Sequence, residues 1–180
     1  MESIALDTAS TRRRDPTAAT KHRLRSLGRR YLALDEEVRS LNKELDALTS
    51  RIVPQLRERF GVGSDVAATL VLAAGDNGGR LRSEAAFSML CGSSPIPASS
   101  GAVHRHRLNR GGDRQANAAL HRVVLARLRW QEPTKAYMAR HRAEGKSETE
   151  IIRCLKRCVA REVYNVLVGP LEKALSADAA

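Results

Sequence analysis

The first part of the fold is decided by residues 16–52, which read PTAATKHRLRSLGRRYLALDEEVRSLNKELDALTSRI. Apolar side chains recur every seven residues at Leu24, Tyr31, Val38, Leu45 and Ile52, and leucines follow three residues later at Leu27, Leu34, Leu41 and Leu48. Charged residues fill the positions between them. This heptad pattern predicts a long helix in a coiled coil, whose apolar seam requires a partner helix. A lone amphipathic helix is the alternative.

Local signals divide the rest of the chain. Residues 1–15 are polar and lack periodicity, which predicts a disordered leader. Asp15 and Pro16 are typical of the start of a helix, and Pro54 ends or bends it. We therefore expect a coiled-coil helix over 16–58, a compact domain over 59–169 and a short tail over 170–180.

The compact domain is expected to be helical, so the fold class is all-α. Ser83 and Asp113 are predicted N-caps, and Ser147 with Glu150 forms a predicted capping box before the last long helix. That helix is expected to end at Gly169-Pro170. The apolar positions expected in the core are, on the two longest helices of the domain, Ala116, Leu120, Val123, Val124 and Leu128, then Ile151, Leu155, Val159, Val163 and Val166.

The chain is strongly basic. Lys and Arg number 31 against 20 Asp and Glu, giving a formal charge of +11 and a pI near 10.4. Such a charge indicates a polyanionic partner bound in a salt-dependent way. The alternative is a solvated arginine-rich surface. Scarce aromatic residues argue against a base-stacking platform for single strands.

The cysteine pattern and the hydropathy indicate which kinds of protein to exclude. Cys91, Cys154 and Cys158 form no C-x-x-C pair, so we expect reduced, cytoplasmic thiols, with Cys154 and Cys158 as small core residues. We expect no membrane segment and no signal peptide. The pair His104 and His106 could share a metal on a strand, but nothing nearby supplies a third ligand, and a basic strand that contacts phosphate is the better interpretation.

A long loop from Cys91 to Gly112 interrupts the helices. Loops of this length inside a compact domain are usually functional or disordered. A possible small ribbon lies at 103–108. Ser99 and Ser100 precede Gly101, and arginines follow, so a serine nucleophile with arginines that hold a phosphate is one hypothesis. An ordinary loop is the other.

Two further motifs could carry chemistry. Gly61 and Gly63 before a helix match either a phosphate-binding hairpin or an ordinary turn. Tyr137 or Tyr164 could be a strand-transfer nucleophile, but the place of Tyr164 on an apolar helix face favours a core role. The acidic residues fit caps, first turns or loops, so no carboxylate cluster for metal-dependent phosphoryl transfer stands out.

The loop and its flanks carry a resemblance. Leu90-Cys91-Gly92-Ser93-Ser94-Pro95-Ile96-Pro97-Ala98-Ser99-Ser100-Gly101, followed by His106-Arg107-Leu108-Asn109-Arg110-Gly111-Gly112-Asp113-Arg114-Gln115-Ala116-Asn117, resembles the C-terminal domain of insertion-sequence transposases of the IS110 family. Residues 61–74 are similar to the opening hairpin of that domain, and residues 137–166 to its closing helices. The heptad helix matches the connecting coiled coil of the family.

The resemblance implies a DNA recombinase guided by a structured RNA. In that family an N-terminal RuvC-like domain supplies a four-carboxylate metal site, and the C-terminal domain supplies a serine that attacks a DNA phosphate. The matching serine is Ser100, with Ser99 as the alternative if the register slips. Arg105, Arg107, Arg110 and Arg114 are expected to contact nucleic acid, and so are Gly61 and Gly63.

The chain departs from the family pattern because only about twenty residues precede the coiled coil, fewer than a RuvC-like domain needs. We expect a truncated transposase that binds DNA and a guide RNA, forms a homo-oligomer through its coiled coil and is inactive alone. It is expected to hold no cofactor, and a divalent metal would come with the acidic domain. The alternative is a non-catalytic nucleic-acid-binding module that regulates transposition.

Overall fold

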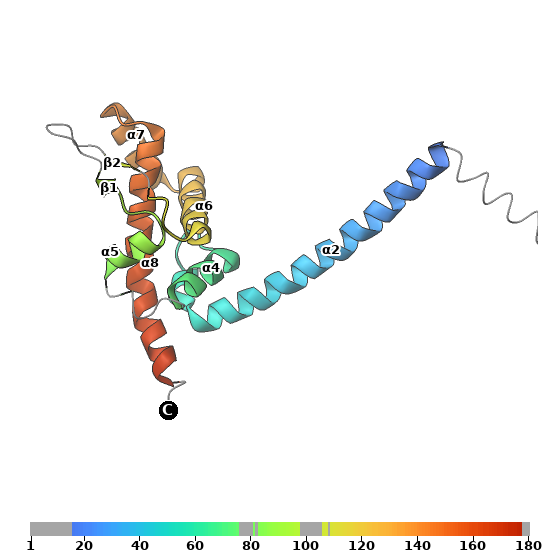
Figure 1. Cartoon of the computed structure of the whole chain (residues 1–180), viewed down its shortest axis with the longest axis horizontal. Coiled ribbons are helices and arrows are strands. Elements are labelled where there is room, and N and C mark those ends of the chain that lie inside the picture. Colours follow the sequence, from blue (N-terminus) through green and yellow to red (C-terminus); the bar gives the residue numbers. More distant parts are fainter. Residues whose placement is uncertain (1–15, 76–80, 82, 98–105, 108, 178–180) are drawn as a thin grey trace, which may run out of the picture. The chain divides into compact units, whose positions relative to one another are not determined.

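The computed structural model describes residues 16–75, 81, 83–97, 106–107 and 109–177. It contains the helices α2 (Pro16–Ile52), α3 (Pro54–Arg57), α4 (Ser64–Gly75), α5 (Glu84–Leu90), α6 (Arg114–Trp130), α7 (Glu132–Ala143) and α8 (Glu148–Ala177), with the two short strands β1 (Ile96–Pro97) and β2 (His106–Arg107) (Figure 1). The fold is therefore all-α with a minimal ribbon, as the sequence predicts. The chain divides into two compact units between Glu44 and Leu45.

Helix α2 confirms the long helix that the heptads predict. It begins at Pro16 and ends at Ile52, immediately before the Val53-Pro54 step, because the proline ring disfavours a helical conformation at the preceding residue. The seam residues of its first part are exposed, Leu24 by 63% and Leu34 by 50%. An apolar seam of this kind is stable in water when another helix covers it.

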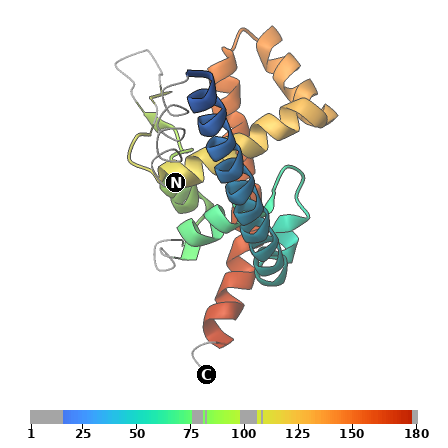
Figure 2. The same ribbon diagram turned by 90° about the vertical axis from the view of Figure 1, so that its right-hand side faces the viewer.

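The second unit packs its helices around one apolar core. Helix α6 contacts α4, α7 and α8, and α8 also lies against α5. Figure 2 shows α6 crossing α8 at a steep angle. The largest fully buried side chains come from every one of α3, α4, α5, α6 and α8, and include Leu56, Leu70, Phe87, Leu120, Ile151 and Leu167. The expected core positions of α6 and α8 are buried, and Leu128 is partly buried against them.

The predicted caps form as expected because each depends on a few neighbouring residues. The Ser83 hydroxyl accepts from the backbone N–H of Ala86, and the Asp113 carboxylate accepts from the N–H groups of Gln115 and Ala116. At the start of α8, the Glu150 carboxylate accepts from the Ser147 N–H and the Ser147 hydroxyl accepts from the Glu150 N–H. Each cap satisfies N–H groups that a helix leaves without partners.

The expected end of α8 at Gly169-Pro170 is wrong. The helix continues through both residues to Ala177. Proline has no backbone N–H, so position 170 cannot donate to the Val166 carbonyl. The proline therefore removes one hydrogen bond from the helix without ending it.

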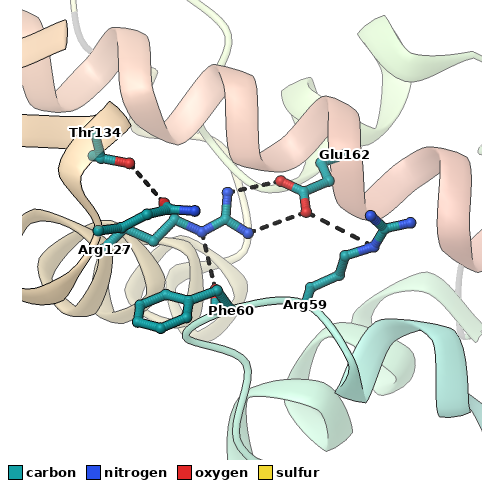
Figure 3. A network of polar contacts seen from close by, with 6 residues as sticks. Arg59, Phe60, Arg127, Thr134 and Glu162 are labelled. Carbon is teal, nitrogen blue, oxygen red and sulfur yellow. Dashed lines mark hydrogen bonds and ion pairs between the residues drawn. The ribbon is translucent and has the colours of Figure 1, made fainter. Parts of the chain in front are cut away.

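An ion pair ties three parts of the second unit together (Figure 3). The Arg127 guanidinium of α6 donates to both carboxylate oxygens of Glu162 on α8, at 2.7 and 3.1 Å, and donates through Nε to the Phe60 carbonyl at 2.9 Å. Arg59 approaches the same carboxylate at 3.8 Å. Because the Arg127 side chain is 13% exposed, this bidentate pair is protected from water and fixes the turn after α3 against α6 and α8.

Candidate nucleic-acid interface

The returning limb of the long loop is bonded to the C-terminus of α5. The last carbonyls of a helix have no partners within it and must find them elsewhere. Here three consecutive carbonyls accept from the returning limb and the start of α6, pairing Met89 O with Asn109 Nδ2 at 3.1 Å, Leu90 O with Asp113 N at 2.6 Å and Cys91 O with Asn117 Nδ2 at 2.7 Å. We call these three bonds the limb clamp. The clamp fixes both ends of the loop on the helical core.

Two glycines allow the limbs to approach this closely. Gly92 has a φ of +62°, which favours glycine, and it follows Cys91, the C-cap residue of α5. A Cβ on Gly112 would lie 2.3 Å from the Gly92 nitrogen and 2.7 Å from the Leu90 carbonyl oxygen. Glycine at 112 is therefore a requirement of the backbone crossing.

A buried lysine supports the clamp from α8. Lys156 is 8% exposed, and its Nζ donates to the Asn117 amide oxygen at 2.9 Å. Burial, together with the positive charge of Arg153, lowers the pKa of Lys156 below its ordinary value. Sequence reasoning missed this residue, because a lysine on an amphipathic helix is ordinarily assigned to the solvent face.

The loop beyond the clamp forms a short ribbon. Ile96 pairs with Arg107 and Pro97 with His106, in antiparallel register. The sequence suggested a ribbon near 103–108 without identifying its partner strand. Ser99, Ser100 and Arg105, like His104, lie outside the described residues. The residues that flank them in sequence, Pro97 and His106, are paired in the ribbon.

The described arginines of the expected interface are exposed and surround the clamp. Arg110 and Arg114 line a cavity of about 230 Å³ together with Asn109, Asn117 and both crossing glycines. Arg107 on β2 lines a second cavity of about 270 Å³ against α8. These three guanidiniums make no ion pair with a described carboxylate, so they present positive charge around the loop.

Of the two glycines before α4, Gly61 has a structural explanation. Gly61 has a φ of +84°, and a Cβ there would lie 3.3 Å from Ala126 of α6, whereas Gly63 has open space around it. Asp65 in the first turn of α4 forms an ion pair with Arg122 and places negative charge at that helix N-terminus. Phosphate binding at Gly61 and Gly63 stays a prediction.

The expected core placement of two cysteines on α8 is wrong. Cys154 and Cys158 are exposed and line the second cavity, whereas the sequence placed them in the core. The core faces of α8 are taken by the valines and leucines together with Ala160, and the thiols fall outside them. On the same helix, Arg157 and Arg161 both bind the Glu84 carboxylate at 3.0 Å. Arg153 has no carboxylate partner among the described residues.

Other candidate chemistry finds no support among the described residues. No three His, Cys, Asp or Glu side chains gather there as a metal-ligand set, and we derive no step through a metal. Tyr164 packs against Phe87 with ring centroids 6.2 Å apart, consistent with the core role expected for it. None of the described helices combines the length and hydropathy of a membrane span.

A family model of known proteins matches the part of the chain that contains the long loop. Residues 53–139 match the family model described as Transposase IS116/IS110/IS902 family. The chain is also 31% identical over 135 residues to the insertion element IS110 uncharacterized 43.6 kDa protein of Streptomyces coelicolor. That alignment covers 73% of this chain and 33% of the relative, so the chain spans about a third of the length of this curated protein. The matched region includes the limb clamp and the loop.

Proposed function

Through residues 53–139 the chain belongs to the IS116/IS110/IS902 family of transposases, and on this premise we propose that it binds DNA around its long loop and supplies Ser100 as the nucleophile of strand transfer. A guide RNA is the second nucleic acid that we propose as a partner. The family resemblance of the serine-glycine pair and the charge of +11 support both parts.

The limb clamp is the observation that carries this proposal. A nucleophile must be held close to its reacting phosphorus, because orientation contributes much of the rate of phosphoryl transfer. The clamp and the ribbon fix the two ends of the segment that contains Ser100. The same limb carries Arg107 and Arg110, whose exposed planar guanidiniums suit phosphate oxygens.

The proposed chemistry is a transesterification. The Ser100 hydroxyl oxygen attacks the phosphorus of a DNA phosphodiester, so an O–P bond forms to serine and the bond to one sugar oxygen breaks. That oxygen leaves as a sugar hydroxyl after it takes a proton, and the serine proton passes to a base. A hydroxyl of a second strand then attacks the phosphoserine and releases the serine. The arginines hold the phosphate and stabilise the charge that develops on its oxygens.

The base and any divalent metal would come from an acidic domain of the kind that the family resemblance implies. We therefore propose that the chain alone binds nucleic acid but performs no strand transfer.

A test for Ser100 uses DNA with the ends of the insertion element IS110, Mg²⁺ and the 43.6 kDa Streptomyces coelicolor relative, which we propose supplies the acidic domain in trans. The readout is DNA attached covalently to the 19.8 kDa chain on a denaturing gel. We expect an adduct that Ser100→Ala abolishes and the matched control Ser99→Ala retains. An adduct that survives Ser100→Ala contradicts the assignment. Absence of any adduct, with DNA binding intact, favours a regulatory module.

We also propose that the chain forms a homo-oligomer through α2. The exposed heptad seam supports this, since apolar residues at 43–69% exposure along one helix stripe are unfavourable in water. Leu34→Lys places a charge on the seam, and Leu32→Lys places one on an exposed leucine outside it, at 66% exposure against 50% for Leu34. Sedimentation equilibrium should show dissociation for Leu34→Lys only. Equal masses for both variants would contradict a coiled coil.

A further inference from the structure

A second cavity of about 270 Å³ lies between the start of the loop and α8. One wall is the segment Gly92–Pro95, and the other is formed by α8, with Arg107 of β2 at the edge. In Figure 1 the two strands lie beside the N-terminal half of α8. Small-ligand pockets usually measure about 300–1,000 Å³. The cavity is close to the lower end of that range, which suits a single nucleotide better than a duplex.

Positive charge gathers at this cavity without a matching described carboxylate. Arg107, Arg153 and Lys156 all line it, and the salt bridges of the described chain include none of the three. Arg157 also lines it but is paired with Glu84. Buried cations are normally paired with an anion. Lys156, at 8% exposure, has instead a neutral amide oxygen as its hydrogen-bond partner.

Electrostatics within the cavity favour an incoming anion. Burial and the neighbouring Arg153 both disfavour the charged form of Lys156, and so its pKa is lowered. A phosphate placed between Arg153 and Lys156 would offset both effects, because its attraction to each cation outweighs the repulsion between them. The buried Arg157 Nη1 also has no hydrogen-bond partner in the described structure.

The remaining wall is apolar. Pro95 from the loop and the thiols of Cys154 and Cys158 from α8 have little capacity for hydrogen bonds and offer a polarizable surface. A wall of this kind fits the face of a nucleobase, whereas a bare inorganic anion would leave it in contact with water. The cavity thus combines a cationic edge with an apolar wall, as the phosphate and the base of one nucleotide require.

Building on the proposed nucleic-acid binding, we propose that this cavity binds one unpaired nucleotide of a DNA or RNA strand, with its phosphate at Arg107, Arg153 and Lys156 and its base against Pro95, Cys154 and Cys158. Extruding a base from a duplex costs free energy because the base must unpair and unstack, and this cost is least for a base that is already unpaired. The site therefore selects single-stranded or unpaired positions.

The two cavity thiols provide a direct test. The full chain is treated with iodoacetamide, with and without a saturating single strand, and alkylation of each cysteine is followed by mass spectrometry. Cys91 is the internal control, because burial raises the pKa of its thiol to about 12 and keeps it unreactive. We expect the bound strand to slow alkylation of Cys154 and Cys158 toward the rate of Cys91. DNA and RNA strands of equal sequence identify the preferred nucleic acid.

A strand of abasic nucleotides separates the base from the phosphate. We expect it to protect the thiols much less than the natural strand at equal occupancy. Equal protection would overturn the base-binding part of the proposal. If fluorescence anisotropy shows strand binding while both thiols react at their free rate, the cavity proposal fails and the proposed function stands. If no strand binds at all, the proposed function itself fails.

A charge variant gives an independent readout. Arg153→Gln should reduce the salt dependence of single-strand binding, lowering the slope of log K against log salt by about 0.7 for one lost phosphate contact. The matched control is Arg129→Gln, which removes the same charge from an exposed position on α6. Equal slopes for Arg153→Gln and the unsubstituted chain would overturn the assignment of the phosphate to this cavity.

Discussion

Gly112→Ala tests whether the close crossing of the loop limbs holds the candidate site together. The added Cβ would lie 2.3 Å from the nitrogen of Gly92 and 2.5 Å from its Cα. Non-bonded heavy atoms reach their best separation near 3.5–4.0 Å, so the limbs must move apart by about 1 Å. Both close atoms belong to the backbone, which cannot rotate away as a flexible side chain would.

The size of the effect follows from the bonds at the crossing. Overpacking costs about 1–3 kcal/mol. Separating the limbs also breaks the 2.6 Å bond from the Asp113 N–H to the Leu90 carbonyl, and a lost hydrogen bond costs about 1 kcal/mol. We therefore expect Gly112→Ala to lower the free energy of unfolding by about 2–4 kcal/mol.

The neighbouring glycine provides a matched control. A Cβ on Gly111 would meet the Asn109 side-chain oxygen at 3.5 Å, an ordinary contact, and its φ is not positive. Because alanine reduces the entropy of the unfolded chain, Gly111→Ala should be neutral or stabilising by up to about 1 kcal/mol. Urea unfolding of the two variants measures the difference. Equal midpoints would refute the idea that backbone contact at Gly112 fixes the loop.

Two other perturbations follow from single contacts. Glu162→Gln removes the carboxylate that binds the little-exposed Arg127 and should lower the free energy of unfolding by about 1.5–3 kcal/mol in urea; a change below that of the exposed control Glu132→Gln would contradict the role of this pair. Hydrogen bonds from Lys146 and His141 lower the pKa of Glu144 from 4.5 to about 2. A carboxyl with a lowered folded-state pKa stabilises the protein above pH 4.5 and loses that contribution as the pH falls toward 2, so Glu144→Gln should flatten the dependence of the thermal midpoint on pH in this window.

Local patterns predicted most of the helical framework. The caps at Ser83, Asp113 and Ser147 and the heptads of α2 depend on residues within a few positions of each other, and all of the helices they predict are present. Core positions on α6 and α8 followed equally well from the helical period. These features depend on residues that are close together in the sequence, so they can be predicted without knowledge of tertiary contacts.

Features that depend on tertiary contacts could not be predicted in this way. Lys156 of α8 is buried because tertiary packing brings α8 to the limb clamp. There its Nζ donates to the side-chain amide oxygen of Asn117, 39 residues away in sequence. Cys154 and Cys158 were expected in the core because small thiols are often buried, but α8 turns them toward the cavity. Glu84 forms ion pairs with Arg157 and Arg161 because α5 packs against α8. The limb clamp also depends on tertiary contacts. The glycines and asparagines near the loop ends were a partial signal for it.

The central claim is that the clamped loop is the nucleic-acid interface of this transposase domain. The most direct measurement is the salt dependence of duplex DNA binding by the full chain and by a variant with glutamine at the three described loop arginines, Arg107, Arg110 and Arg114. If each contacts one phosphate, the slope of log K against log salt should fall by about 2.7. A control variant with glutamine at three exposed arginines of α2, namely Arg23, Arg25 and Arg30, should keep the original slope. An unchanged slope in the loop variant, or an equal fall in the control, would contradict the claim.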